Sequence, residues 1–407
     1  MQKPLATTHR LAALRHRGFR LFWIDSLLSS TARWADLVMI GWLTLEITNS
    51  ALWVGIVSGS KFAGYILAPF MGVAADRIDR RRLLITASLV NWTVSLIMLL
   101  LLLTDALALW HIICLALVSS LTTALDNPTR QSFVPDLVDR EDLTNAIALN
   151  AVALEITVVV GPALGGMLIP TLGMRGAYGL IACIYLMDLL MLCLLKGVKH
   201  SIAEVHESPL QSLLSGLKYV RGNQAVLALL VIACLLNLFA ATYRYAFLPV
   251  FARYVLNIGP TGYGMLTSMA GVGALVAGLW VVSRGNFRRK GWLTLFGGLL
   301  WPASLLLFAL STSYYLSLGL VFVAGVAQSI TWTAIAALIL SHTEPPMRGR
   351  VMGIRTGVVI SLPFGNFLAG GLAERFGAPI ALVAYSVSAI IFMLVIIVLV
   401  PSLRRLE

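Results

Sequence analysis

The chain has 407 residues, of which 59% are hydrophobic and 12% are charged, and its formal net charge is +12. Soluble globular domains carry about 25% charged residues, so this composition excludes an ordinary soluble enzyme. The charges form short runs between long apolar stretches. This pattern predicts membrane-spanning helices, because such long apolar segments satisfy their backbone hydrogen bonds in lipid only as helices.

A helix needs about 20 apolar residues to cross the core of a bilayer. Twelve stretches of the sequence meet or approach that length. We therefore predict an all-α integral membrane protein with twelve transmembrane helices at about 19–46, 51–75, 82–103, 107–126, 143–170, 175–195, 224–250, 261–282, 291–310, 314–341, 350–374 and 378–400.

Most of the 30 Lys and Arg residues fall on one side of this predicted membrane, namely in the N-terminus, the even-numbered loops and the C-terminus. Positive charge collects on the cytoplasmic side of membrane proteins, so both termini are predicted to be cytoplasmic. We expect a multi-pass protein of a bacterial inner membrane. The basic charge is then a topology signal with affinity for anionic lipid headgroups, and we expect no nucleic-acid partner.

The first two predicted helices carry charges at membrane depth, where such groups usually face a cavity or a partner. Arg33 and Asp36 lie three residues apart and can pair on one helix face, which is the arrangement we expect. Lys61 enters at a similar depth on the second helix, and Trp34 can supply an aromatic cavity wall. Asp25, near the cytoplasmic end of the first helix, is interpreted as a gate or interface charge. Asp25 and Asp36 are also candidates for proton coupling.

The second predicted helix ends in a distinctive motif, in which Gly72 is followed by Asp76-Arg77 and then by Arg80 and Arg81. A glycine in a membrane helix lets another backbone approach closely. A carboxylate at the membrane boundary is suited to meet the positive N-terminus of a neighbouring helix. A simple cluster of charges that stops translocation would explain the arginines but not the spaced glycine.

Glu155 lies close to the middle of the fifth predicted helix, with no basic residue within a helical turn of it in sequence. Desolvation disfavours the ionised form of such a carboxylate, which suits it to take up and release protons. Proton or substrate handling is the expected role, and static pairing with a basic residue on another helix is the alternative. Glu155 is therefore a candidate both for proton coupling and for the substrate cavity.

The segment 197–223 is the most polar interruption without a span of its own, and we predict that it is a cytoplasmic linker between two six-helix halves, 1–196 and 224–407. Motifs recur across it at a nearly constant offset. Gly165-Gly166 in the fifth helix recurs as Gly370-Gly371 in the eleventh, 205 residues later. An even number of spans per half makes these parallel repeats, an architecture that suits alternating access to a site between the halves.

The second half contributes further cavity candidates. Arg244 lies in the seventh helix, which the repeat places opposite the first, and it is flanked by Tyr243. Trp332 can supply another aromatic wall. If Arg33, Lys61 and Arg244 all face the cavity, its outer half is positive, and we then expect an anionic or zwitterionic substrate rather than a lipophilic cation.

The fifth helix carries Gly161, Pro162, Gly165 and Gly166, which permit bending and close helix packing. This run resembles the antiporter motif of exporters in the major facilitator superfamily. The motif from Gly72 to Arg81 resembles the signature between helices two and three of the same superfamily, with Asp79 in place of its second glycine. That resemblance implies that Asp76 and the arginines latch helix two to helix eleven in the outward-facing state.

Other runs resemble the branch of macrolide-efflux and enterobactin-efflux exporters, among them Asn127-Pro128, Val134-Pro135 and Arg348-Gly349-Arg350. The chain departs from proton-coupled drug exporters in one respect, since the segment 109–125 lacks the arginine that such exporters usually carry in helix four.

We therefore predict a secondary active transporter, specifically a proton-coupled exporter of a small drug-like or siderophore-like organic molecule, working by rocker-switch alternation. An importer or facilitator of an organic anion, amino acid or lipid is the alternative. An intramembrane enzyme or a receptor is more remote, because the six histidines fall in loops or near helix ends. We expect no cofactor and no metal, and a monomer whose partners are the substrate, protons and lipid.

Overall fold

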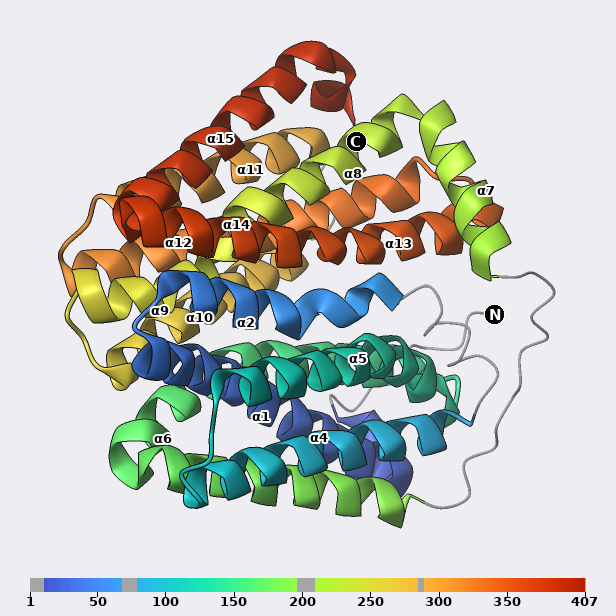
Figure 1. Ribbon diagram of the computed structural model, residues 1–407. Coiled ribbons are helices and arrows are strands. Elements are labelled where there is room, and N and C mark those ends of the chain that lie inside the picture. The colour runs from blue at the N-terminus through green and yellow to red at the C-terminus, as the bar shows by residue number, and fades with distance from the viewer. Residues whose placement is uncertain (1–10, 68–78, 196–208, 285–288, 407) are drawn as a thin grey trace.

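The computed structural model describes residues 11–67, 79–195, 209–284 and 289–406, and these residues form helices and no strand. Figure 1 shows the arrangement of the elements, which are, in chain order, η1 (Ala12–Arg15), α1 (Arg17–Thr48), α2 (Ala51–Ala63), η2 (Gly64–Leu67), α4 (Arg80–Leu103), α5 (Leu109–Phe133), η3 (Val134–Asp136), α6 (Leu143–Leu194), α7 (Pro209–Gly222), α8 (Gln224–Leu235), η4 (Leu236–Ala240), η5 (Ala241–Arg244), α9 (Phe247–Val250), η6 (Phe251–Val255), α10 (Pro260–Arg284), α11 (Lys290–Ala309), α12 (Tyr314–Ser341), η7 (Pro345–Met347), α13 (Arg348–Gly357), η8 (Val358–Ile360), α14 (Ser361–Phe376), α15 (Ala378–Leu399) and η9 (Pro401–Arg405).

Nine helices in the described ranges are long and apolar enough to cross a membrane. One of them, α6, holds two of the predicted spans, because Gly173 with φ of 68° interrupts its helical geometry. These nine helices therefore account for ten of the twelve predicted spans. The remaining two spans are the shorter apolar helix Ala51–Leu67 and the charged helix α1. The prediction of an all-α membrane protein with twelve spans is therefore confirmed, with 68–75 of the second span outside the described residues.

The fourth span differs from its prediction. It was expected to end at 126, but α5 continues to Phe133 in spite of Pro128. Asp126 and Arg130, which were expected near the end of the span, pair with each other one turn apart inside the helix. The prediction followed the apolar run, whereas the helix continues beyond it through this charged turn.

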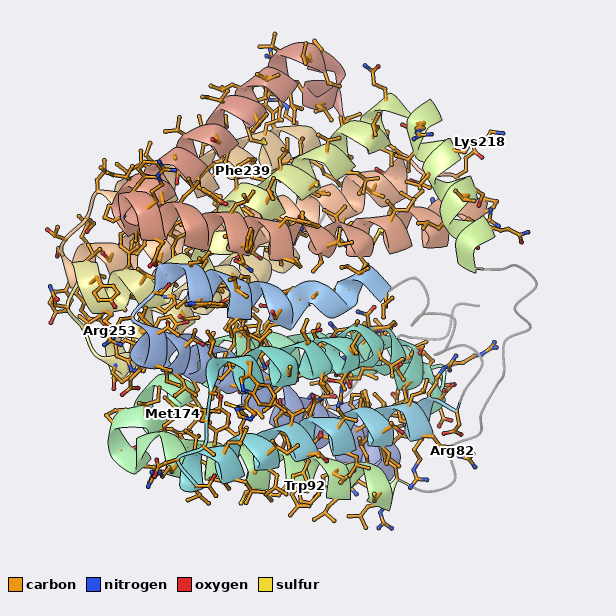
Figure 2. All side chains as sticks on the ribbon, in the orientation of Figure 1. Arg82, Trp92, Met174, Lys218, Phe239 and Arg253 are labelled. Carbon is orange, nitrogen blue, oxygen red and sulfur yellow. The ribbon has the colours of Figure 1, made fainter. Side chains whose placement is uncertain are left out.

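The helices form two halves. Figure 1 shows α1, α4, α5 and α6 in the lower part of the view and α8, α11, α12, α14 and α15 in the upper part. The halves meet where α2 packs along α14 and where α6 packs along α10. Within the predicted linker, residues 209–222 form the helix α7, which packs against α13. Figure 2 shows Arg82 and Lys218 at one end of the bundle and Arg253 at the opposite end, which we name the Asn49 end.

Two pairs of glycines let the halves approach backbone to backbone towards the Asn49 end. A Cβ atom added to Gly55 of α2 would lie 2.8 Å from the Cα of Gly370 in α14. A Cβ atom added to Gly166 of α6 would lie 2.8 Å from the Cα of Gly264 in α10. These distances are too short for a side chain, so both seams require glycine.

The other glycines of the predicted packing motif have different neighbours. Gly161 and Gly165 lie on either side of Pro162 in the motif. A Cβ atom added to Gly161 would lie 2.5 Å from the Cβ of Trp34, and one added to Gly165 would lie 2.6 Å from the carbonyl oxygen of Ala35. They therefore pack α6 against α1 within one half. A Cβ atom on Gly371 would make only an ordinary contact of 3.9 Å with Leu52.

Glu374 closes the seam between α2 and α14. Its carboxylate accepts hydrogen bonds from the Ser50 hydroxyl at 3.0 Å, the Ala51 amide at 2.7 Å and the Leu52 amide at 3.3 Å. It thus caps the N-terminus of a helix that belongs to the other half, where a negative charge is favoured by the helix dipole. Arg253 adds a bond of 2.9 Å to Asn49 across the same end.

We expect Gly370→Ala to destabilise the protein and Gly371→Ala not to. Both changes gain the same helix propensity, but only the first places a methyl group 2.8 Å from the Ala51 carbonyl oxygen. Overpacking of this kind costs about 1–3 kcal/mol. Thermal unfolding of the purified variants should show a lower midpoint for Gly370→Ala, and equal midpoints would contradict the proposed seam.

Candidate functional site

A cavity of about 550 Å³ lies between the two halves. Its size falls within the range of about 300–1,000 Å³ that is usual for small-molecule sites. Both halves contribute to its lining, which consists of Ser30, Arg33, Trp34, Asp36, Leu37, Lys61, Phe62, Tyr65, Asn91, Ser119, Thr123, Asn127, Leu154, Glu155, Thr157, Val158, Tyr185, Asn237, Ala241, Tyr245, Gln328, Trp332, Arg355, Thr356, Val359 and Leu362.

The seventh span changes its helical form where it reaches this cavity. After α8 the backbone becomes a π-helix in η4 and then a tight 3-10 turn in η5. Asn237, Ala241 and Tyr245, which come from or directly follow these turns, line the cavity. Short π and 3-10 segments inside a helix often occur at functional sites, because they turn side chains that a regular helix would direct elsewhere.

Five of the seven residues predicted for the substrate cavity line it, namely Arg33, Trp34, Lys61, Glu155 and Trp332. The other two, Tyr243 and Arg244, are not in the lining and are 0% and 6% exposed. Arg244 donates a hydrogen bond of 3.2 Å to Gln328, and its guanidinium lies 5.8 Å from the centre of the Trp34 ring. Arg244 therefore lies outside the lining and contacts two residues of it, Gln328 and Trp34.

The expected pairing of Arg33 with Asp36 is wrong. Arg33 reaches across to α5 and donates to Asp126 at 3.1 Å. Asp36 instead accepts from Lys61 of α2 and, at 3.2 Å, from the hydroxyl of Tyr178. Spacing along one helix could not reveal these partners, because all three come from helices that pack against α1 in the folded chain.

These pairs also remove the argument for a positive outer half of the cavity. Arg33 and Lys61 line the cavity, but each is matched by a carboxylate. Arg244, the third cation in that argument, lies outside the lining. The two cations that line the cavity are therefore neutralised by protein carboxylates, and the third does not face the cavity.

Two other charged residues in the lining remain without an ion pair among the residues that the structure describes. They are Glu155 on α6 and Arg355 on α13. Glu155 has an exposed side chain, and Arg244 is close enough to influence it electrostatically without pairing with it. The guanidinium of Arg355 lies 5.9 Å from the centre of the Trp332 ring.

Arg355 was not among the residues predicted from the sequence, although the sequence contains a signal for it. Arg355 falls inside the predicted span 350–374, just as Arg33 falls inside the first span. The same test of charge at membrane depth would have selected it.

The proton-coupling candidate Asp25 does not line the cavity but belongs to a buried charge cluster. Arg130 donates to Asp25, to Asp126 at 2.8 and 2.9 Å, and to Ser26 at 3.1 Å. Asp188 lies 3.8 Å from the same guanidinium. The cluster joins α1, α5 and α6, and Asp126 links it to Arg33 at the cavity wall.

The predicted latch falls partly outside the described residues, since Gly72, Asp76 and Arg77 lie in the range 68–78. Arg80 donates to Asp136 at 2.6 Å and to the Ser132 carbonyl at 3.0 Å. Arg81 donates to the carbonyl groups of Leu192 and Cys193 at 3.2 and 2.9 Å. Both arginines thus tie α4 to other parts of the N-terminal half.

We expect Arg130→Ala to be strongly destabilising, because it leaves buried carboxylates without their counter-charge. Breaking a buried pair in this way costs about 3–5 kcal/mol. Arg175→Ala is the control, since its pair with Asp105 is 54% and 79% exposed, and surface pairs contribute about 0–1 kcal/mol. Thermal unfolding in detergent would measure both, and a midpoint for Arg130→Ala near that of the control would show that the cluster is not structural.

Comparison with known proteins points to one family. The family model described as transmembrane secretion effector matches residues 8–407. Macrolide efflux protein A of Streptococcus pyogenes is 22% identical over 373 residues, covering 88% of this chain and 90% of that protein. The enterobactin exporter EntS of Shigella boydii serotype 18 is 26% identical over 405 residues, covering 96% of this chain and 93% of the exporter.

Solved structures share the fold at low identity. The nucleoside transporter NupG has a TM-score of 0.70 at 13% identity and covers 94% of this chain and 98% of its own. A bacterial homologue of the human lysosomal transporter Spinster has a TM-score of 0.71 at 14% identity, with 96% of each chain covered.

Proposed function

The chain belongs to the transmembrane secretion effector family of the major facilitator superfamily, and we propose that it is a proton-coupled exporter of a small organic molecule. The observation that carries this proposal is the cavity between the halves, with the carboxylate of Glu155 in its lining and without an ion-pair partner in the described ranges. A carboxylate in that position can bind a proton or a cationic group of a substrate, but not both.

Alternating access is supported by the way the halves touch. The hydrogen bonds described between them involve residues 49–58 and 159–166 of one half and 245–268 and 374 of the other. These bonds lie between the level of the cavity and the Asn49 end, whereas the contacts of α2 and η2 with η8, farther from that end, contain no hydrogen bond among the described residues. The distribution of Lys and Arg supports an arrangement in which this end faces outward and both termini are cytoplasmic. The chain would then be in a state that is closed to the outside.

Glu155 is the preferred coupling residue among the three carboxylates selected from the sequence. Asp25 lies outside the cavity lining, where it cannot meet a substrate, and Asp36 is held by Lys61 and Tyr178. A fixed cation beside a carboxylate stabilises its ionised form and so makes protonation less favourable. Protonation of Glu155 from outside would release a bound cationic group, and deprotonation towards the cytoplasm would prepare the site for the next substrate.

Export is supported by the relatives, whose names describe efflux of a macrolide and of enterobactin. We propose that this chain acts as a monomer in a bacterial inner membrane. The nucleoside transporter of similar fold has only 13% identity and carries no argument about direction.

We expect Glu155→Gln to abolish proton-driven export, because glutamine keeps the shape of the side chain and cannot exchange a proton. The measurement is accumulation of a panel of cationic dyes, macrolides and siderophores in efflux-deficient cells, with and without a protonophore. Wild type should lower the accumulation of one class, and the variant and the protonophore should each restore it. Glu344→Gln, at an exposed carboxylate outside the cavity, should behave like wild type.

Two outcomes would contradict this proposal. If wild type raises the accumulation of a compound, transport runs inward and the chain is an importer. If Glu155→Gln still exports against a gradient in a protonophore-sensitive way, proton coupling resides elsewhere, with Asp36 and Asp25 as the next residues to test.

A further inference from the structure

Glu155 and Arg355 present opposite charges from opposite halves of the same cavity, on α6 and α13 respectively. The other charged residues in the lining, Arg33, Asp36 and Lys61, are matched by fixed partners. After pairing, the described lining therefore offers a substrate one anionic group and one cationic group.

The partly buried position of the charged side chain of Arg355 requires a physical explanation. Its side chain is partly buried, and its Nε atom is shielded from solvent without a hydrogen-bond partner in the described part of the chain. Charged groups at membrane depth are costly, and they usually mark a pathway or a binding site. The ring of Trp332 offsets part of that cost but gives the buried Nε donor no hydrogen-bond partner, and the described residues provide none either.

An unused guanidinium of this kind selects an anion. Its donors form a planar fork that fits the two oxygens of a carboxylate or a phosphate. Glu155 has the complementary preference, because an ionised carboxylate only accepts hydrogen bonds and therefore favours an ammonium group. Neither residue alone would exclude a singly charged substrate, but together they favour a molecule that carries both charges.

The rest of the lining suits a flat or apolar body between those charges. Six aromatic residues from both halves surround the cavity, namely Trp34, Phe62, Tyr65, Tyr185, Tyr245 and Trp332. A cavity of about 550 Å³ accommodates a drug-sized molecule. Aromatic walls also favour planar groups through stacking.

We propose that the substrate is a zwitterion, with its cationic group on Glu155, its carboxylate or phosphate on Arg355 and an aromatic or apolar body between them. This inference rests on the proposed function and names its substrate class. A zwitterion bound in this way connects the two halves directly. A proton on Glu155 would displace only the cationic end, so the anionic end would leave Arg355 in a separate step.

Three closely matched probes test the proposal on the purified full chain. Ciprofloxacin carries a piperazinium and a carboxylate on an aromatic core, its methyl ester lacks the anion, and its N-acetyl derivative lacks the cation. Binding is followed by the fluorescence anisotropy of the quinolone. We expect wild type to bind ciprofloxacin about tenfold or more tightly than either derivative, because each charged contact of this kind is worth at least that factor.

The variants separate the two contacts. Arg355→Gln should bind ciprofloxacin and its methyl ester equally, and Glu155→Gln should bind ciprofloxacin and its N-acetyl derivative equally. Lys218→Gln, at an exposed lysine outside the lining, should retain the preference of wild type.

The proposal is overturned if wild type binds a derivative as tightly as the zwitterion, or if none of the three probes binds. It is also overturned if Arg355→Gln retains the full preference for ciprofloxacin over its ester. These outcomes differ from failure of the proposed function. Protonophore-sensitive export of a purely cationic compound by wild type would leave the exporter standing and refute the zwitterion.

Discussion

The cost of placing charge inside a membrane determines much of this structure. Each ionised side chain at that depth must find a counter-charge, a hydrogen-bond partner or a water-filled space. Most of them here find a counter-charge on another helix, as Arg33 does on α5 and Lys61 does on α1. These pairs fix the arrangement of the first half. Because the pairing is so extensive, the two charges of the lining that have no ion pair among the described residues, Glu155 and Arg355, are the ones on which the proposals above rest.

The same helices form the contact between the halves and the wall of the cavity. On α2, Gly55 touches α14, and two turns further along Lys61 and Phe62 line the cavity. On α14, Gly370 touches α2, while Leu362 lines the cavity. A rigid helix cannot separate at one end without moving at the other. Opening of the Asn49 end would therefore change the shape of the cavity, as alternating access requires.

The number of spans and the glycine motifs could be read from the sequence because they depend on local properties. The length of an apolar run and the absence of a side chain at Gly166 or Gly370 do not depend on what packs nearby. The partners of charged residues depend on tertiary structure. Asp126 is 93 residues from Arg33, and no spacing rule relates them. The change from α-helix to π-helix in the seventh span could not be predicted from the sequence either, because the sequence around Asn237 contains neither proline nor glycine.

The two halves have kept the same packing but not the same charges. The contact between Gly55 and Gly370 has its counterpart in the contact between Gly264 and Gly166, with the roles of the halves exchanged. In contrast, the N-terminal half supplies Arg33, Asp36, Lys61 and Glu155 to the described cavity lining, and the C-terminal half supplies Arg355. Opening of the Asn49 end would separate both seams together, and symmetric contacts favour such a motion. Recognition of a substrate with two different ends requires the opposite, because its two charges need unlike partners. A duplicated fold can satisfy both demands only if its packing residues stay alike while its cavity residues diverge.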